Sequence, residues 1–372
     1  MLIGIDASRA VATRPTGTET YSRQLIQALL RSESERTESA RHQFRLYFRD
    51  PPAEGMFPGA ELRHIPFPRL WTHLRLSWEM ARRPPDVLFV PAHVLPLIRP
   101  RISLVTIHDL GYLHFPGAHP WPQRLHLDLS TRWSTQVATH IIAVSQATKA
   151  DLVSRYRTPP NKITVAYHGY DETLTPIHDP ARIEAAKARY GIAGDYFFYL
   201  GTLQPRKNLT RVIDAFASVE SQAILVLAGK RGWLYDDLFE QIHRLGLDSR
   251  VVFPGYVRDE DKAALLSGAA AFVFPSLYEG FGLPVLEAQA CGCPVITSTT
   301  SSLPEVTKQN AALLVNPQDT ASIATAMQRI ANDPILRRTL IERGFINARR
   351  FSWATCAQTV LDTIEQCVSS ET

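Results

Sequence analysis

Cysteine is scarce in this sequence, which has four, at positions 291, 293, 356 and 367. Cys291 and Cys293 close an expected helix, and the residues beside them supply no further ligands for a zinc site. Neither Cys356 nor Cys367 is near them in the sequence. We therefore expect reduced thiols in a cytoplasmic protein, without disulfides or a structural metal.

Long apolar runs are lacking as well. No window of about 18 apolar residues exists, which excludes a transmembrane helix, and the first residues are typical of a strand rather than of a secretory signal. The net charge of +4 suits an anionic substrate or a peripheral contact with the anionic cytoplasmic face of a membrane. Many ordinary enzymes have a similar charge, and we expect no nucleic-acid partner.

Strand and helix patterns alternate through both halves of the 372 residues, a length that suits two domains. Expected strands lie at 2–6, 44–48, 61–65, 86–90, 102–107, 140–144 and 163–166, and again at 196–200, 223–228, 251–253, 272–274, 295–296 and 312–315. The pattern breaks into Gly, Asp, Thr and Pro at 169–180. We therefore predict an α/β protein of two doubly wound, Rossmann-like domains, residues 1–170 and 181–350.

The stretch 272–296, FVFPSLYEGFGLPVLEAQACGCPVI, predicts a strand, a tight loop, a helix and a strand in turn. Gly280 and Gly282 let the backbone approach a ligand, and Pro284 suits the first turn of a helix. The N–H groups at such a helix start suit a phosphate. The carboxylates of Glu279 and Glu287 instead suit the hydroxyls of a vicinal diol. Together these groups indicate a nucleotide sugar.

The same residues carry a resemblance to a known family. Glu279 and Glu287 match the E-x7-E element of retaining GT-B glycosyltransferases, and EGFGLPVLEA is similar to the wording of family 4, also called group 1. The resemblance implies two facing domains with a cleft between them, the first on the acceptor side and the second binding the nucleotide-sugar donor. A final helix at about 353–372 would pack back onto the first domain. Glu279 would contact sugar hydroxyls and Glu287 the ribose, and the donor would also contact Gly280, Phe281, Gly282 and Leu283.

Two cations, Arg206 and Lys207, follow the strand at 196–200 and precede an expected helix at 209–219. Cations at a helix start oppose its dipole, so the pair is either a solvated surface feature or a counter-charge for a ligand. Fixed positive groups stabilise the charge that grows on a departing diphosphate. The pattern G-x-x-x-x-R-K-N, beginning at Gly201, is similar to the family's diphosphate-binding loop.

His108 and Asp109 end the strand at 102–107. The resemblance implies that His108 touches the donor sugar from across the cleft, usually at its 6-hydroxyl; a general-base couple and a structural His–Asp pair are the alternatives. Family members commonly carry two glycines near the end of the first loop, here 7–17. Only Gly17 remains, because Glu19 occupies the second place. We expect Gly17 to bring a backbone N–H near the diphosphate.

Other loops give weaker signals. Gly229, Tyr256 and Val257 follow second-half strands, where the resemblance places the nucleotide base, although ordinary turns would look the same. The acidic triplet at 259–261 is interpreted as the start of a helix rather than a D-x-D metal site. Because Arg206 and Lys207 already supply positive charge, we expect no metal and no other cofactor. The nucleoside diphosphate sugar is a substrate.

The segment 66–80 mixes large apolar residues with Arg and His. It is interpreted either as a helix packed on the sheet or as an amphipathic face that touches the acceptor or membrane lipid.

The residues at 276–306 are most similar to bacterial mannosyltransferases that use GDP-mannose in polysaccharide assembly, with a glycan or lipid-linked hydroxyl as acceptor. Since no carboxylate is well placed as a covalent nucleophile, the family's front-face route with retention is expected.

Three alternatives stay open for the function. A UDP-glucose or UDP-hexosamine donor would fit the same motifs. A nucleotide-sugar epimerase of the same architecture would need acid and base residues at the sugar that the sequence does not reveal. A non-enzymatic sugar-nucleotide sensor would bind the donor without turnover, and Arg206, Lys207 and His108 argue against it.

Overall fold

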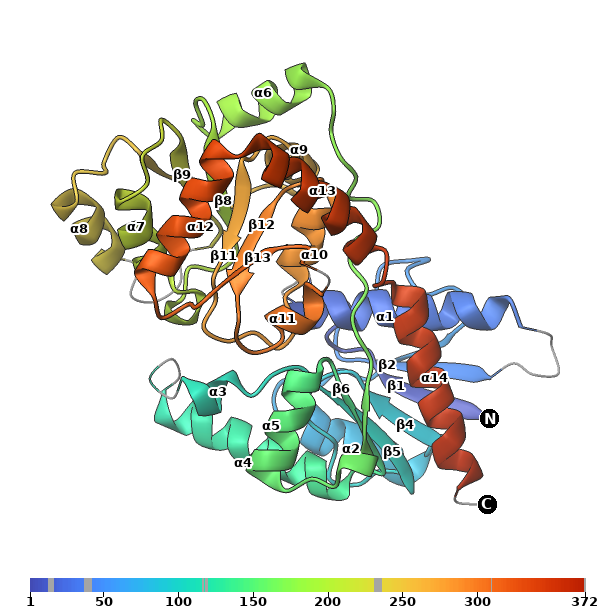
Figure 1. Ribbon diagram of the computed structural model, residues 1–372. Coiled ribbons are helices and arrows are strands. Elements are labelled where there is room, and N and C mark those ends of the chain that lie inside the picture. The colour runs from blue at the N-terminus through green and yellow to red at the C-terminus, as the bar shows by residue number, and fades with distance from the viewer. Residues whose placement is uncertain are drawn as a thin grey trace. The chain divides into compact units, whose positions relative to one another are not determined.

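The computed structural model describes residues 1–12, 17–36, 42–115, 117, 120–230, 236–308 and 310–370. The chain divides into two compact units. Unit 1 comprises Met1–Gly169 together with Phe351–Thr372, and unit 2 comprises Tyr170–Arg350 (Figure 1). Each unit is a parallel sheet with helices packed around it, which confirms the predicted α/β class.

Unit 1 is built on a seven-stranded sheet with the strand order β3-β2-β1-β4-β5-β6-β7. All its neighbouring strands pair in parallel. β4 and β5 are buried along their whole length, because helices cover both faces of a doubly wound sheet. The strands are β1 (Leu2–Asp6), β2 (Gln43–Phe48), β3 (Glu61–His64), β4 (Val87–Val90), β5 (Ile102–Ile107), β6 (His140–Ala143) and β7 (Ile163–Val165).

The helices of unit 1 include the last helix of the chain, which packs along the first (Figure 1). Tyr21 and Leu25 of α1 share a buried apolar cluster with Trp353, Val360 and Ile364 of α14. The α-helices are α1 (Gly17–Ser34), α2 (Ser77–Arg82), α3 (Gly111–His114), α4 (Trp121–Val137), α5 (Gln146–Tyr156) and α14 (Trp353–Ser369), and a π-helical turn, η2 (Trp71–Leu76), leads into α2.

Unit 2 repeats the pattern with a six-stranded parallel sheet in the order β10-β9-β8-β11-β12-β13. Its strands are β8 (Tyr196–Leu200), β9 (Ile224–Ala228), β10 (Val251–Gly255), β11 (Ala271–Phe274), β12 (Val295–Ser298) and β13 (Leu313–Val315). Its helices are α6 (Pro180–Arg189), α7 (Leu209–Ala217), α8 (Asp236–Arg244), α9 (Asp259–Ser267), α10 (Leu283–Ala290), α11 (Leu303–Val306), α12 (Thr320–Asn332) and α13 (Pro334–Ala348).

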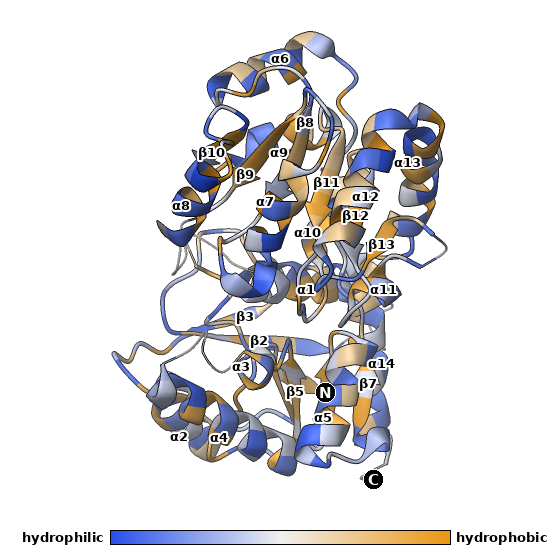
Figure 2. Cartoon of the chain, turned by 60° about the vertical axis from the view of Figure 1, so that its left-hand side comes forward, coloured by the Kyte–Doolittle hydropathy of each residue, from blue (hydrophilic) through white to orange (hydrophobic). Residues whose placement is uncertain are grey.

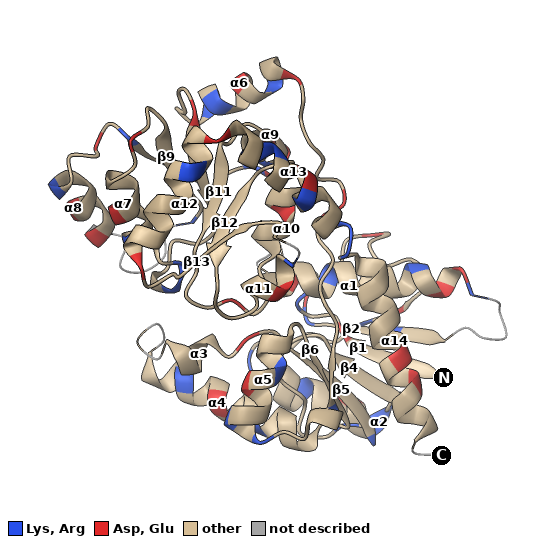
Figure 3. Cartoon of the chain, viewed as in Figure 1, with Lys and Arg blue, Asp and Glu red and all other residues tan. Residues whose placement is uncertain are grey.

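The strands hold apolar side chains and the loops hold charge. β11 and β12 are fully buried and contain no charged residue, and they are drawn as apolar in Figure 2 and uncharged in Figure 3. Burial of these side chains drives folding of the sheet. Charged side chains near these two strands therefore come from the loops and helices that follow the strands.

The strand order reverses beside the first strand of each sheet. In unit 2, β8 lies between β9 and β11, so the connections that leave β8 and β11 diverge to opposite faces. Ligands of doubly wound sheets bind at this switch point, outside the carboxyl ends of the strands. The two loops that meet there are residues 201–208 and 275–282.

Three short helices, α3, α6 and α11, are not predicted from the sequence. α6 begins at Pro180, and the Asp179 side chain accepts a hydrogen bond from Ala181 N–H at 2.9 Å. The Asp–Pro pair at the end of the irregular stretch 169–180 is typical of a helix start, a signal that the sequence analysis does not use. A helix over the whole of 66–80 is wrong, because Leu70 is left-handed at φ 54° and the helix begins at Trp71.

The sequence also predicts helices at 119–137 and 234–245, and their first residues fall outside the described residues, as do residues 13–16 of the first loop. Where the structure describes the chain, no helix is both long enough and apolar enough to cross a bilayer. The four cysteines are free and buried.

Candidate active site

The loop between β11 and α10 depends on a glycine. Gly282 has a φ of +115°, and a Cβ there would lie 2.8 Å from the side chain of Leu303. An L-residue would be strained and crowded in this place. α10 then begins at Leu283, with Pro284 in its first turn as predicted.

Two serines from the turn before α11 hold the same loop in place. Ser302 Oγ lies 2.9 Å from the carbonyl oxygen of Glu279 and 2.7 Å from that of Phe281, so its hydroxyl donates to this loop. Glu279 N–H donates to Ser301 Oγ at 3.1 Å. Gly280 and Phe281, both predicted donor residues, are therefore part of a loop whose shape is set by groups outside it. A preorganised site needs support of this kind.

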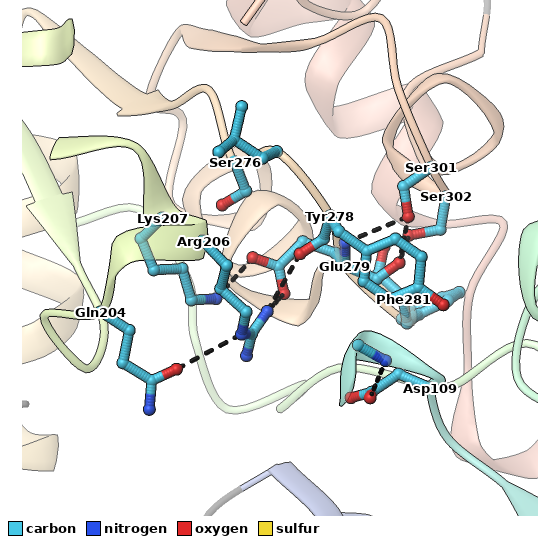
Figure 4. A network of polar contacts seen from close by, with 12 residues as sticks. Asp109, Gln204, Arg206, Lys207, Ser276, Tyr278, Glu279, Phe281, Ser301 and Ser302 are labelled. Atoms are coloured by element: carbon cyan, nitrogen blue, oxygen red, sulfur yellow. Dashed lines mark hydrogen bonds and ion pairs between the residues drawn. The ribbon is translucent and has the colours of Figure 1, made fainter. Parts of the chain in front are cut away.

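Glu279 pairs with both cations of the loop that follows β8 (Figure 4). Arg206 Nη1 donates to its Oε2 at 2.8 Å, and Lys207 Nζ donates to its Oε1 at 2.5 Å. Arg206 Nη1 also donates to the carbonyl oxygen of Tyr278 at 3.0 Å. Lys207 Nζ lies 4.6 Å from the centroid of the Phe274 ring, a cation–π contact. The cluster joins the two loops at the switch point of unit 2.

The carboxyl group of Glu279 is ionised at neutral pH. Burial opposes its ionisation, but the charges of Arg206 and Lys207 outweigh that effect and lower its pKa to about 2. Two cations and one anion leave the cluster with a net positive charge. Each carboxylate oxygen accepts one hydrogen bond from a cation, and a carboxylate has about four acceptor positions in all. Glu279 can therefore still accept hydrogen bonds from sugar hydroxyls.

This pairing adds to the explanation of the two cations. The sequence offers a bound diphosphate as their counter-charge, and the structure shows that Glu279 also supplies counter-charge within the chain. Arg206 and Lys207 lie in a 3-10 turn, η5 (Pro205–Lys207), that precedes α7. The alternative of a solvated basic pair is wrong for Lys207, which is only 7% exposed.

Asn208 fastens this turn to the rest of unit 2. Its backbone is left-handed at φ 65°, and its Nδ2 donates to the carbonyl oxygens of Pro275 at 3.1 Å and Pro317 at 2.6 Å. Pro275 directly follows β11. The amide therefore holds the loop of Arg206 and Lys207 against the loop of Glu279.

Glu287, the second predicted carboxylate, lies on α10 and pairs with a lysine from α9. Lys262 Nζ is 2.6 Å from Glu287 Oε1, and the two side chains are 19% and 15% exposed. Like Glu279, this carboxylate is held by a cation of the chain itself. Lys262 uses one acceptor position of this carboxylate, which has about four in all, so the group can also accept hydrogen bonds from hydroxyls.

The remaining predicted donor residues lie at the ends of β8, β9 and β10. A Cβ on Gly229 would lie 1.9 Å from the carbonyl oxygen of Gly201, so only glycine fits where these strands end. Tyr256 is 60% exposed, and Lys230 Nζ lies 5.9 Å from its ring centroid. Val257 is buried. The structure thus places all four predicted positions along one edge of the sheet.

The acidic triplet serves the start of a helix, as predicted. Asp259, Glu260 and Asp261 form the first turn of α9. Asp261 also pairs with Arg189, and its Oδ2 accepts from the hydroxyl of Tyr190 at 2.8 Å. Over the described ranges, no three His, Cys, Asp or Glu side chains are grouped closely enough to hold a metal ion.

In unit 1, His108 follows β5 and is 7% exposed. Burial, together with nearby His93, lowers its pKa to about 3, so the ring is neutral near pH 7. Its Nε2 lies 2.8 Å from the carbonyl oxygen of Pro91. Since a carbonyl only accepts, Nε2 carries the proton and Nδ1 is an acceptor. So weak a base argues against the general-base alternative.

Asp109 has a partner of its own, which argues against a simple structural His–Asp pair. Its Oδ1 accepts from Gly111 N–H at 2.9 Å, at the start of α3. The contact of His108 with a donor sugar stays a prediction.

Gly17 is the first residue of α1 and is exposed. Glu19, which replaces the family's second glycine, lies in the first turn, where its charge favours the helix dipole. It pairs with Arg9 Nη1 at 3.2 Å. The helix start is therefore regular without the second glycine. The role of Gly17 at a diphosphate stays a prediction.

Comparison with known proteins decides the family. Residues 15–174 match Glycosyltransferase Family 4, and residues 184–346 match Glycosyl transferases group 1. The O-antigen chain mannosyltransferase B of Escherichia coli is 31% identical over 293 residues, which are 77% of this chain and 76% of that protein. The chain belongs to the family 4 glycosyltransferases. The resemblance seen in the sequence is thereby confirmed.

Solved structures agree on the fold of this glycosyltransferase. Sucrose-phosphate synthase (tll1590) from Thermosynechococcus elongatus aligns over 100% of both chains, with a TM-score of 0.77 and 22% identity. Anabaena Alr3699/HepE in complex with UDP and glucose aligns over 98% of this chain and 99% of that one, with a TM-score of 0.75 and 19% identity. The predicted GT-B fold is confirmed.

Three supporting residues of the glycosyltransferase are not predicted from its sequence. Asn208 stands in the R-K-N triplet and Ser302 in the run SSLPEV, so a local signal exists for both. Lys262 reaches Glu287 from a different helix, and no local pattern encodes that contact.

Proposed function

We propose that this glycosyltransferase moves mannose from GDP-mannose to a hydroxyl group of a glycan or lipid-linked acceptor in polysaccharide assembly of the O-antigen kind. The transfer retains the anomeric configuration and needs no metal ion. The observation that carries the proposal is the cluster of Arg206, Lys207 and Glu279, because it offers fixed positive charge and a hydroxyl acceptor at one switch point. The choice of mannose rests on the likeness to the Escherichia coli mannosyltransferase.

Each part of the donor has a matching group. Glu287 accepts hydrogen bonds from the ribose hydroxyls, with its carboxylate placed by Lys262. Backbone groups around Tyr256 and Val257 contact the base. The diphosphate binds to Arg206 and Lys207, because the planar guanidinium of arginine and the compact ammonium of lysine both suit phosphate oxygens. Sugar hydroxyls bind to the unused acceptor positions of Glu279.

Arg206 and Lys207 serve the reaction by stabilising the leaving group. The bond between C1 and the β-phosphate oxygen breaks, and the acceptor oxygen bonds to C1 from the same face, which retains the configuration. The acceptor proton passes to an oxygen of the leaving phosphate. Negative charge grows on that phosphate in the transition state, and cations already held in place by Glu279 stabilise it without reorganisation. Neither carboxylate is assigned as a nucleophile, since Glu279 is paired through both oxygens and Glu287 binds ribose.

A thermal-shift panel of GDP, UDP and ADP tests the donor, because a ligand that binds only the folded protein raises its Tm. We expect the largest shift with GDP. With GDP-mannose and oligosaccharide or polyprenyl-linked acceptors, NMR of the product should show the donor's anomeric configuration, and EDTA should leave the rate unchanged. A shift with UDP alone would redirect the donor to a UDP-sugar. Epimerised sugar from donor alone, or binding without any turnover, would replace the proposal by an epimerase or a sensor.

A further inference from the structure

Exposed apolar side chains concentrate on one part of unit 1. Of the sixteen large hydrophobic residues exposed in the described chain, seven lie on η2, α2, α4 and the connection at 97–98, and an eighth, Leu70, directly precedes η2. Leu70, Leu74 and Trp78 follow one another at intervals of four residues and are 60%, 48% and 55% exposed. Single exposed hydrophobic residues are ordinary, but contiguous ones mark interaction surfaces.

α4 carries a second row with the same spacing. Trp121, Leu125 and Leu129 are 65%, 41% and 54% exposed. Residues four apart lie on the same side of an α-helix, so the three form a stripe along its outer face. The fully buried residues of α4 are instead polar and small, among them Ser130 and Ser134, while Leu127 and Val137 pack partly buried against the core. α4 thus exposes large apolar residues that an ordinary surface helix would bury.

The rows and the 97–98 connection are neighbours in the fold. The backbone N–H groups of Leu97 and Ile98, both 51% exposed, donate to Ser77 Oγ at the start of α2, at 2.9 and 3.2 Å. The rings of His73 on η2 and His126 on α4 lie 6.3 Å apart. Figure 2 draws α2 next to α4. The exposed residues therefore form one surface.

Arginines surround this surface. Arg69, Arg82 and Arg83 are exposed beside the first row, and Arg124 lies on α4. The carboxylates of these segments pair with other arginines, Glu79 with Arg63 and Arg75 and Asp128 with Arg132. The Arg82 guanidinium lies 4.8 Å from the Trp78 ring centroid, which places positive charge directly at an exposed apolar ring.

The acidic groups of the same segments are already engaged. Glu79 is buried and pairs with Arg63 at 2.8 Å and Arg75 at 3.2 Å. Asp128 accepts from the hydroxyl of Tyr156 at 2.7 Å. The surface that faces outward is therefore apolar with a positive border.

We propose that η2, α2, residues 97–98 and α4 form a docking face for the surface of an anionic phospholipid bilayer. Trp and Leu side chains enter the interfacial region, where Trp is enriched, and the arginines bind lipid phosphates. A symmetric contact between two copies would instead bring the same arginines together. The proposal extends the amphipathic segment seen at 66–80 to α4, and it does not depend on the proposed donor or acceptor.

Flotation of the full chain with vesicles tests the face. We expect binding to phosphatidylcholine vesicles that contain phosphatidylglycerol and much weaker binding to pure phosphatidylcholine, with a decrease as salt rises. Combining Arg82→Gln, Arg83→Gln and Arg124→Gln should lower the partition coefficient by on the order of 10², since each basic residue contributes roughly fivefold. Combining Leu74→Ser, Leu125→Ser and Leu129→Ser should lower it by at least about tenfold.

Matched controls lie on α13 of unit 2, where Ile335, Arg338, Arg343 and Ile346 are exposed. Their Ser and Gln variants should bind vesicles as the wild type does. Equal binding by all variants, salt-independent binding, or no binding would overturn the proposal. A dimer that becomes monomeric in the Ser variant would reassign the face to contacts between copies. The salt and lipid dependence of wild-type binding tests the proposal even where a variant fails to fold. The variants should keep an unchanged GDP thermal shift, so a failure of this proposal can be told apart from a failure of the proposed function.

Discussion

The two units share a strand order but differ in the chemistry at the carboxyl edge of their sheets. In unit 2 that edge concentrates charge, with Arg206 and Lys207 on either side of Glu279. The pKa of Glu279 falls to about 2 because the two cations outweigh its burial. The three groups stay charged because they pair with one another, and the two cations suit a charged diphosphate.

In unit 1 the histidine rings at the corresponding edge are uncharged. Burial is the main cause that lowers the pKa values of His93, His108 and His168, so all three rings are neutral near pH 7. The Tyr21 ring lies 4.6 Å from both His108 and His168. One architecture thus supports either ionic or neutral chemistry, and the choice depends on whether opposite charges or aromatic rings surround the titratable groups.

The largest expected effect removes the counter-charge of unit 2. Glu279→Gln leaves Arg206 and buried Lys207 facing an amide, so the free energy of unfolding should fall by about 3–5 kcal/mol at pH 7. The folded pKa of about 2 lies below the ordinary value of 4.5, so this stabilisation is present above about pH 4.5 and is lost as the pH falls toward 2. Urea unfolding of both proteins at pH 7 and at low pH should show the difference shrinking.

Glu287→Gln is the matched control, because it removes a carboxylate that pairs with one lysine rather than two cations. We expect it to cost less than Glu279→Gln. Equal losses in the two variants would contradict the idea that unit 2 keeps charge through the double pairing.

Next in size is the catalytic effect of the two cations. Arg206→Ala and Lys207→Ala should each lower kcat by about 10²–10³ while donor binding stays measurable, because each stabilises charge that grows in the transition state. The double variant should lose less than the product of the single losses, since both groups act on one diphosphate. Arg338→Ala, exposed on α13, should behave as the wild type in the same steady-state assay. A rise in KM with kcat intact would reassign the residue to ground-state binding.

Much of this site can be predicted from the sequence, because its residues stand in short local patterns. Glu279, Gly282 and Pro284 belong to one strand–loop–helix run, and backbone requirements of that run identify them without tertiary information. The hydrogen bonds of Asn208 and Ser302 cross between loops. Only the fold brings those partners together, so residue type alone does not reveal them.

Pairing across elements limits the sequence analysis in a second way. Opposite charges 72 residues apart, at Lys207 and Glu279, make one cluster, yet the sequence suggests separate roles for them. Likewise the sequence does not reveal that Ser130 and Ser134 of α4 are buried while its apolar stripe is exposed, because an apolar stripe is ordinarily the buried one.

A smaller effect is expected at the second carboxylate of unit 2. Glu287→Ala should weaken GDP binding by about 1.5–3 kcal/mol, the range for a hydrogen bond to a charged group. Lys262→Ala should weaken it less, because Lys262 only positions Glu287. Adding Lys262→Ala to Glu287→Ala should change little further, and isothermal titration calorimetry can measure all three variants. Unchanged affinity in Glu287→Ala would remove the ribose assignment.

The smallest effect concerns the neutral edge of unit 1. His108→Phe keeps a ring but removes the Nδ1 acceptor. The activation free energy derived from kcat/KM should therefore rise by about 0.5–1.5 kcal/mol, the net contribution of one hydrogen bond. With a 6-deoxy-mannose donor the wild type and the variant should become equal, since the predicted partner is the 6-hydroxyl. A pKa of about 3 lies below the ordinary 6.5, so His108 should contribute no inflection to the pH–rate profile between pH 5 and 8. Equal losses of kcat/KM with both donors would make the role of His108 structural. An inflection near pH 6.5 that disappears in His108→Phe would restore the general-base role and end the contrast between the two edges.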